Sequence, residues 1–263
     1  MRKWLALACI GVLLAIAAFA WLRATNGGKE AEMSEAPLPE TCREAAFEGI
    51  GYVICAVDPR SHAIGLHLKA ADGRPYGSLA ELARTQPFLF AMNAGMYHHD
   101  FSPVGLYVES GIEGAPLNLD DGEGNFFMKP NGVFFVDREG RAAVTKSAAF
   151  AAARPDAWMA TQSGPMLVID GAVHPRFEPN GASRYIRNGV GVRADGVAVF
   201  AISREKVSLG SFARLFRDRL ECPNALFFDG DISALHDDRR YVVGGPFPAG
   251  PMVTVSGRGG AEV

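Results

Sequence analysis

The feature that most constrains the fold of this 263-residue chain is a succession of short apolar runs separated by glycine-rich turns. Glycine accounts for 30 of the 263 residues, roughly 11%, whereas the average usage is about 7%. The runs are apolar throughout or alternate between apolar and polar residues, which is typical of β-strands. The expected strands span residues 52–57, 63–68, 88–92, 104–109, 125–128, 132–137, 142–145, 166–170, 190–193, 197–202 and 225–228.

Helical signals are few. Ser78 with Glu81 three residues later resembles a capping box, and Pro87 ends the short helix that this pair begins. Residues 208–220 place four large apolar side chains on one helical face before Pro223: Phe212, Leu215, Phe216 and Leu220. Many strands, few helices and no regular alternation of the two predict an α+β fold with a strand-rich mixed sheet core.

The N-terminal segment determines the expected domain organisation. Arg2 and Lys3 precede an uncharged apolar run over residues 4–22, which is long enough as a helix to cross a membrane. Ala18-Phe19-Ala20 also fits a signal-peptide cleavage site. Residues 1–23 are therefore expected to be either a signal peptide or an N-terminal membrane anchor. The basic pair predicts that the rest of the chain is periplasmic or extracellular.

Composition divides the rest of the chain. Residues 24–41 are small, polar and proline-bearing, as in a linker, and residues 42–263 are long enough for one globular domain. The net charge is −3 and no basic run occurs, so we expect no nucleic-acid partner. A membrane is an expected partner only through the N-terminal helix, if that helix is not cleaved.

Three cysteines lie beyond the apolar segment, and an oxidising compartment favours their pairing. Residues 48–51 form a plausible hairpin turn between Cys42 and Cys55, which predicts a disulfide between these two. Cys222 is then left unpaired and is expected to be buried. The alternative is a metal site, but no Cys-x-x-Cys spacing supports it.

Four strand ends share one design, a polar residue beside glycine. Glycine lets a ligand approach the backbone, while the strand holds the polar side chain in place. Each of these segments alone is an ordinary turn, but four in one chain favour a shared pocket. They are Asn93-Ala94-Gly95, Ser163-Gly164, Arg187-Asn188-Gly189 and Asp229-Gly230.

These segments resemble the phosphodiester glycosidase family, most closely its bacterial branch. The family also contains the mammalian enzyme that uncovers mannose 6-phosphate by removing N-acetylglucosamine. The similarity covers most of residues 42–240, in the order AMNAGMY, SPVGLYVESG, GNFFMKPNGVFFVD, ATQSGPMLVIDG, RYIRNGVGV and CPNALFFDGDIS. One departure concerns the family's Leu-Asp-Gly-Gly-Gly-Ser-Ser element, where Asp231-Ile232-Ser233 follows Asp229-Gly230.

The resemblance implies hydrolysis of the bond between a sugar's anomeric carbon and a phosphodiester oxygen. The leaving group is a phosphate monoester, whose second pKa of about 6 makes strong general-acid assistance unnecessary. The site then needs a cation for the phosphate, a carboxylate near the anomeric carbon and donors for the sugar hydroxyls.

The residues that match the family elements receive expected roles. Arg187 is expected to clamp the phosphate, since a guanidinium donates two parallel hydrogen bonds; its alternative is a structural ion pair. Asp229 is expected to act as base or nucleophile, with Glu109 as the second carboxylate or a mere surface residue at a strand end. A carboxylate separation of about 5 Å implies retention and about 6.5–9.5 Å implies inversion. The expected substrate-binding residues are Asn93, Gly95, Ser163, Gly164, Arg187, Asn188, Gly230, Ser233 and His98.

The run His98-His99-Asp100 allows three interpretations: a solvent-exposed loop, a substrate contact or a metal site. Adjacent histidines usually point apart, and zinc sites prefer longer spacings, so we expect no metal and no cofactor. His236 is a weaker candidate for a substrate contact. Phe126, Phe127, Phe134 and Phe135 are expected in the core.

The sequence therefore favours an extracytoplasmic hydrolase that cleaves the glycosidic bond of a sugar 1-phosphodiester. Its expected partner is a sugar phosphodiester or envelope glycan substrate. Two alternatives remain open from the sequence. One is a non-catalytic carbohydrate- or phosphate-binding module, and the other is a metal-dependent phosphodiesterase that cuts the P–O bond.

Overall fold

The computed structural model describes residues 36–230 and 232–258. The signal peptide or anchor expected at residues 1–23 and most of the linker expected at 24–41 lie outside the described residues, so this organisation stays a prediction. From Leu38 onward the chain packs as a unit of its own. No helix in the described part of the chain is long and apolar enough to cross a membrane.

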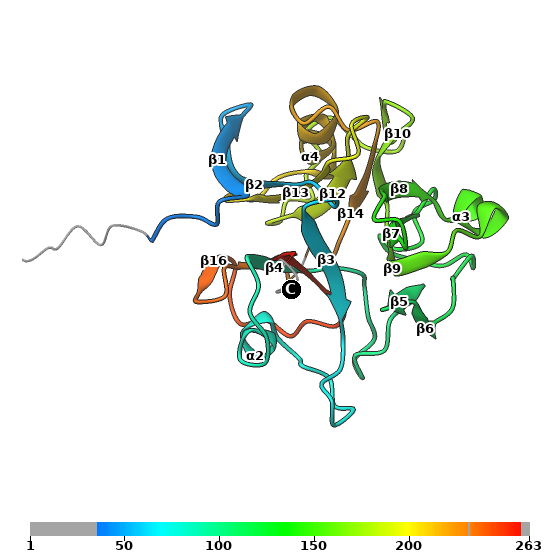
Figure 1. Cartoon of the computed structure of the whole chain (residues 1–263). Helices are drawn as coiled ribbons and strands as arrows, with labels where there is room; N and C mark the ends of the chain where they lie inside the picture. Colours follow the sequence, from blue (N-terminus) through cyan, green and yellow to red (C-terminus); the bar gives the residue numbers. More distant parts are fainter. Residues whose placement is uncertain (1–35, 231, 259–263) are drawn as a thin grey trace, which may run out of the picture. The chain divides into compact units, whose positions relative to one another are not determined.

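Three antiparallel sheets form the domain (Figure 1). The first has seven strands, in the order β1 (Cys42–Phe47), β2 (Ile50–Val57), β13 (Ala198–Ser203), β12 (Asn188–Val192), β14 (Asn224–Phe227), β10 (Met166–Ile169) and β11 (Ala172–Val173). The second has five strands, in the order β16 (Tyr241–Val243), β15 (Leu235–His236), β4 (Phe90–Asn93), β17 (Met252–Gly257) and β3 (His62–His67). The third has the order β6 (Ile112–Ala115), β5 (Tyr107–Glu109), β9 (Ala157–Ser163), β7 (Gly132–Asp137) and β8 (Ala142–Lys146).

The helices are short: α2 (Leu79–Ala83), α3 (Ser147–Ala153) and α4 (Leu209–Arg214), which continues as a π-helical stretch, η1 (Leu215–Arg219). The α+β, strand-rich class is thus confirmed, and the strands pair antiparallel rather than in a mixed arrangement. The strand expected at 125–128 is wrong. Those residues form turns, in which Met128 N donates to Asn125 O over 3.2 Å, and Phe126 is nevertheless buried.

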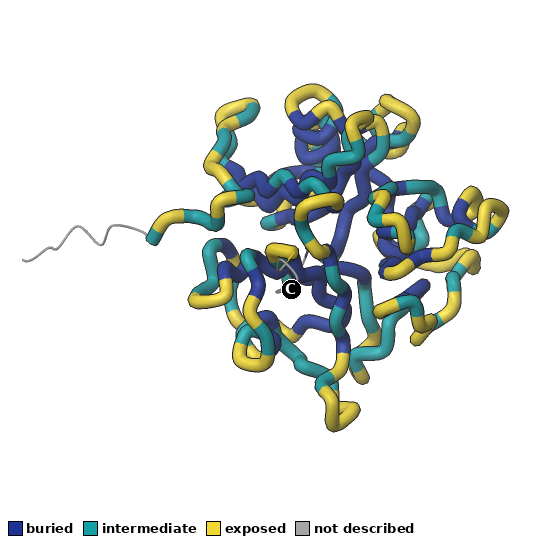
Figure 2. The backbone as a smooth tube through the Cα atoms, in the orientation of Figure 1, coloured by how far each residue is buried: buried dark blue, intermediate teal, exposed yellow. Residues whose placement is uncertain are grey.

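The main core is built from buried side chains of all three sheets, and Figure 2 shows the buried residues gathered in the inner strands of the domain. Phe200 of the first sheet meets Phe90 of the second at 5.5 Å between ring centroids, and Phe134 of the third at 5.6 Å. A second cluster joins the opposite face of the first sheet to α4 and η1, through Phe212 and Phe216. Burial of aromatic rings from all three sheets explains why they form one domain.

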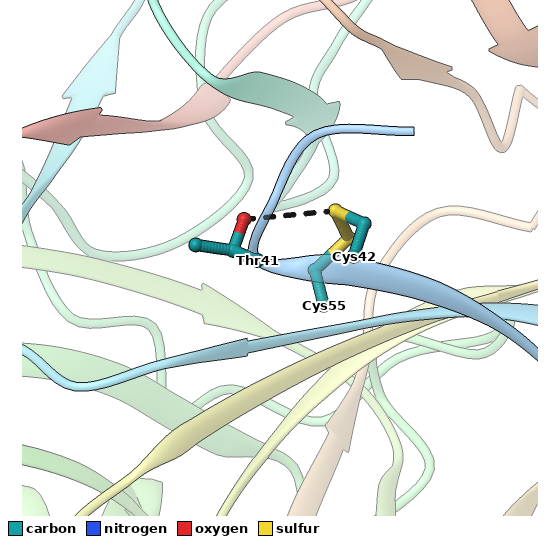
Figure 3. Close-up of a disulfide and its surroundings, with 3 residues drawn as sticks. All are labelled: Thr41, Cys42 and Cys55. Atoms are coloured by element: carbon teal, nitrogen blue, oxygen red, sulfur yellow. Dashed lines mark hydrogen bonds between the residues drawn. A yellow bond between two sulfur atoms is a disulfide. The ribbon is translucent and has the colours of Figure 1, made fainter. Parts of the chain in front are cut away.

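The N-terminal hairpin is as expected. The two turn residues Glu48 and Gly49 have φ of 50° and 76°, which suits a tight hairpin turn between β1 and β2. This turn sets Cys42 directly opposite Cys55, and the predicted disulfide is confirmed, with the two Cα atoms 3.9 Å apart (Figure 3). Cys222 is buried and free within the described residues.

Candidate functional site

The candidate site lies where the first and second sheets meet at the ends of β4, β12 and β14. In the antiparallel pair of β12 and β14, Gly189 lies opposite Phe227, and the amide of Phe228 donates to Asn188 O over 3.2 Å. Arg187 and Asp229 lie just beyond this paired stretch. The Arg187-Asn188 segment and Asp229, far apart in the sequence, thus lie at the same end of the sheet.

Buried side-chain amides join this edge to β4. Asn93, the last residue of β4, donates its Nδ2 to the carbonyl oxygen of Asp229 over 3.0 Å. Asn188 Nδ2 donates to Asn93 O at 2.8 Å and to Asn93 Oδ1 at 2.9 Å, and Ala234 N donates to the same Oδ1 at 2.9 Å. Ser233 Oγ lies 3.1 Å from both Asn188 Oδ1 and Asp229 O, as their donor. The network fixes the backbone on both sides of the Asp229 loop.

This network gives the Asn93 side chain partners within the protein. Its side chain is only 1% exposed and is occupied with the Asp229 loop and Asn188. Asn188 and Ser233 are equally buried. A direct donation from Asn93 to a sugar therefore stays a prediction, while the structure gives these residues the task of holding the loop.

Arg187 is also buried, with 1% of its surface exposed. Its Nε donates to Val207 O at 2.9 Å and its Nη2 to Ser183 O at 3.1 Å, and its guanidinium carbon lies 5.2 Å from the centre of the Phe227 ring. A Cβ built on Gly230 would lie 3.2 Å from Nη1, so the guanidinium extends beneath the Gly230 backbone. Phosphate clamping stays a prediction; in this conformation the guanidinium donates to Val207 O and Ser183 O and lies close to Gly230.

An open cavity of about 670 Å³ lies next to this network. Asp229 is the member of the network that reaches it, and its side chain is half-buried. The other lining residues all come from the loop after β4: Tyr97, His98, His99, Asp100 and Ser102. Because that loop begins directly after Asn93, the hydrogen bond from Asn93 to Asp229 couples the two walls of the cavity.

The electrostatics of the cavity follow from these neighbours. Burial, and then the negative charge of Asp229, raise the pKa of Tyr97 to about 12, so this phenol keeps its proton at neutral pH. Its hydroxyl donates to Pro248 O over 2.7 Å. The hydroxyl of Ser102, and then its backbone amide, lower the pKa of Asp100. The cavity therefore presents the carboxylates of Asp100 and Asp229 beside two imidazoles.

Three motif residues do not line this cavity but pack around it. A Cβ on Gly95 would lie 2.5 Å from Thr161 Oγ1 and 2.7 Å from Gln162 O, so glycine permits the loop after β4 to approach β9 closely. A Cβ on Gly164 would lie 2.6 Å from Phe126 O, so this glycine likewise permits a close approach of two backbone segments. Ser163 is fully buried, and its hydroxyl has no hydrogen-bond partner among the described residues.

Glu109 lies at the end of β5, outside the lining of the cavity. Its Oε2 accepts a hydrogen bond from the Tyr107 hydroxyl, and its Oε1 lies 3.5 Å from Nδ1 of His67. The carboxylate is thus engaged between two neighbouring side chains, and its catalytic role stays a prediction. His236 is likewise turned into the structure, where it packs edge-on against Phe88 and Tyr241.

Sequence reasoning named Asp229 and His98 but gave no role to Tyr97 or Ser102. Their signal was position, because both lie in the loop that the Asn93-Ala94-Gly95 turn begins. His98, His99 and Asp100 are exposed, and His98 N donates to Ser102 O over 2.8 Å. Within residues 36–230 and 232–258, no group of three or more histidine, cysteine or acidic side chains is placed to hold a metal ion.

Comparison with known proteins gives independent matches. Residues 87–235 match the phosphodiester glycosidase family. The uncharacterized protein YigE of Escherichia coli strain K12 is 36% identical over 205 residues, which is 76% of this chain and 78% of the relative.

Two solved structures share the fold. One is the catalytic domain of zebrafish N-acetylglucosamine-1-phosphodiester alpha-N-acetylglucosaminidase, auto-inhibited by its pro-peptide, with a TM-score of 0.61, 13% identity and 86% of both chains covered. The other is a hypothetical protein from Synechocystis, with a TM-score of 0.57, 14% identity, 82% of this chain and 61% of that chain covered. At these identities the likeness concerns the fold alone.

Proposed function

The chain belongs to the phosphodiester glycosidase family, and from this we propose that it hydrolyses the glycosidic bond of a sugar 1-phosphodiester. The substrate binds in the cavity between the Asp229 loop and the loop of residues 97–102. The family assignment supports the reaction class, and the chemistry of the cavity supports the assignment of individual residues.

One observation carries the proposal: the half-buried carboxylate of Asp229 faces the cavity on a loop that buried hydrogen bonds hold in place. Asn93 Nδ2 and Ser233 Oγ both donate to its backbone carbonyl, at 3.0 and 3.1 Å. A catalytic group must be held within a fraction of an ångström of its working position, and support of this kind provides that. Asp229 acts as base for a water molecule or as nucleophile at the anomeric carbon.

The phosphate needs positive charge near Asp229. Arg187 provides it from beneath Gly230, where the absent side chain leaves Nη1 next to the loop backbone. His98 and His99 line the opposite side of the cavity and contact the phosphate or the sugar. Because the departing phosphate monoester is a stable anion, the reaction needs charge stabilisation more than a strong general acid.

The same proposal places the reaction outside the cytoplasm. The Cys42–Cys55 disulfide supports this location, because disulfides form and persist in oxidising compartments and are rare in the cytosol. The N-terminal segment, with its basic pair followed by an apolar run, also supports a location outside the cytoplasm.

Product identification tests the proposed reaction. The purified protein is incubated with UDP-N-acetylglucosamine, and the products are separated and identified by mass spectrometry. Cleavage of the glycosidic bond gives UDP and N-acetylglucosamine, which is the expected result. Cleavage of a P–O bond would instead give UMP and N-acetylglucosamine 1-phosphate.

Two results would contradict the proposal. P–O cleavage that a chelator abolishes would support a metal-dependent phosphodiesterase. Binding without turnover of UDP-N-acetylglucosamine and of a synthetic N-acetylglucosamine phosphodiester would support a binding module. A mock preparation from cells that do not express the protein serves as the control for contaminating hydrolases.

A further inference from the structure

A second cavity, of about 370 Å³, lies beside an exposed tryptophan at the start of β9. Trp158 is 42% exposed, although its neighbours Ala157 and Met159 are buried. Ile64 and Val136 add buried apolar side chains to the cavity wall. A large aromatic ring that remains open to solvent beside a cavity is a typical contact surface for a ligand.

This cavity is separate from the Asp229 site. Trp158 and Ser163 lie at opposite ends of β9, and a strand advances about 3.4 Å per residue, so the two ends are roughly 17 Å apart. A strand of the second sheet also runs from the Asp229 site to the second cavity. In β17, Met252 lies opposite Asn93 near the catalytic edge, and Gly257 lies opposite His62 beside the second cavity.

Two guanidinium groups give the second cavity a positive character. Arg258 lines it, donates Nη2 to Pro59 O at 2.8 Å and pairs with no carboxylate in the described part of the chain. Arg138 lines it as well, with its guanidinium carbon 5.4 Å from the centre of the Trp158 ring and its Nε 3.0 Å from the exposed carboxylate of Asp156. The carboxylate of Asp137 is occupied by Arg141 through a 2.8 Å bond. Arg258 therefore contributes positive charge that no carboxylate of the wall balances.

Arg138 and Trp158 both lie close to Gly111. A Cβ on Gly111 would collide with its guanidinium, and Gly111 N donates to Trp158 O over 2.7 Å. The guanidinium of Arg138 thus lies over the Trp158 ring and close to Gly111. A guanidinium over an aromatic ring offers an anion contact next to an apolar surface.

We propose that this cavity is a second saccharide-binding site, which takes an anionic sugar. Trp158 contacts the sugar ring, and Arg258 and Arg138 bind its phosphate or carboxylate. Such a site would hold another part of a charged glycan while the Asp229 site acts on a phosphodiester about 17 Å or more away. Binding here does not require the hydrolysis proposed above, so the two claims can fail separately.

Tryptophan fluorescence of the full chain tests this site. Trp158 is the one tryptophan beyond residue 40, and Trp4 and Trp21 are the other two. Titration with glucose 1-phosphate and, separately, with glucuronate should change the emission saturably. Uncharged glucose should bind at least about tenfold more weakly, since a charge-assisted hydrogen bond contributes roughly 1.5–3 kcal/mol. The stronger of the two anionic sugars identifies phosphate or carboxylate as the preferred group.

Three variants make the test decisive. Measured by calorimetry, which needs no tryptophan, the dissociation constant should rise about tenfold in Trp158→Ala and in Arg258→Gln, and it should stay unchanged in the exposed Arg43→Gln. The proposal is overturned if neither sugar gives a saturable response, or if Trp158→Ala or Arg258→Gln binds like Arg43→Gln. An emission change that follows protein concentration instead of sugar concentration would indicate self-association and would also overturn it.

Discussion

The side-chain amide of Asn188 donates to two oxygens of Asn93, the main-chain carbonyl at 2.8 Å and the side-chain oxygen at 2.9 Å. These residues end β4 and begin β12, so their contact joins the ends of strands from two different sheets. Asn93 in turn donates to the carbonyl of Asp229. The position of the proposed catalytic loop therefore depends on a contact between residues 95 positions apart in the sequence.

Replacing Asn188 should weaken both the fold and the activity. In Asn188→Ala the buried oxygens of Asn93 lose a donor, and a buried group without its partner costs about 1–3 kcal/mol. We expect the free energy of unfolding to fall by this amount in urea titrations. Turnover should fall by about tenfold or more, because misplaced catalytic groups are costly. Asn180→Ala, on the exposed surface, is the matched control and should change neither quantity. Equal stability of the two variants would contradict the role of the Asn93–Asn188 contact.

The close approach of the loop after β4 to β9 depends on Gly95. In Gly95→Ala the new methyl group would meet Thr161 Oγ1 at 2.5 Å and Gln162 O at 2.7 Å, so the loop must move away from β9. Overpacking of this kind costs about 1–3 kcal/mol. We expect a lower unfolding midpoint and reduced turnover, since the cavity loop begins at this residue. Gly257→Ala is the control, because a Cβ there meets nothing within 4 Å. If both variants unfold at the same denaturant concentration, the packing argument is wrong.

The Cys42–Cys55 disulfide should stabilise the domain by restricting the unfolded chain. The bond closes a loop with a sequence separation of 13, for which the chain-entropy estimate is about 3 kcal/mol. Unfolding in guanidinium with and without a reductant measures the difference. The double variant Cys42→Ala/Cys55→Ala should match the reduced protein and should not respond to the reductant. A reductant effect that persists in this variant would assign it to another cysteine.

Two buried histidines predict that acid destabilises the fold. Burial lowers the pKa of His174 and of His236 below the ordinary value of 6.5, so near and below that pH the unfolded chain binds protons that the folded chain does not. Stability from these groups is therefore full above about pH 7 and is lost as the pH falls below 6.5. Urea unfolding at pH 7.5 and 5.5 measures this loss. The loss should be smaller in His236→Phe and unchanged in the exposed His99→Gln; the opposite order would contradict the assignment.

Much of the strand pattern could be predicted from sequence because those strands either alternate or are bounded by glycine turns. The hairpin before Cys55 and the N-cap at Ser78, which accepts from Glu81 N over 3.2 Å, are local signals of this kind. β9 was missed because it lies between β5 and β7 and is buried on almost its whole length, so its sequence AWMATQS shows no alternation. Residues 125–128 were wrongly predicted as a strand because Phe126 is buried although it lies in a turn.

The sequence predicted which residues gather at the candidate site, but not which of them line the cavity. A polar residue beside glycine marks Asn93, Asn188 and Asp229, and the structure brings all three together. The sequence does not reveal which of them face solvent, because burial is decided by neighbouring strands. Asn93 and Arg187 therefore lie behind the cavity, whereas Asp229 reaches it.

The central claim is that Asp229 performs the hydrolysis, and the turnover number of Asp229→Asn tests it most directly. This substitution keeps the shape of the side chain and removes its charge, and loss of a positioned acid–base group costs about 10²–10⁴ in rate. The matched control is Asp195→Asn, in the exposed turn between β12 and β13. We predict that Asp229→Asn releases N-acetylglucosamine from UDP-N-acetylglucosamine at least about a hundredfold more slowly than the wild type and Asp195→Asn, at an unchanged unfolding midpoint. Full activity in folded Asp229→Asn would contradict the account.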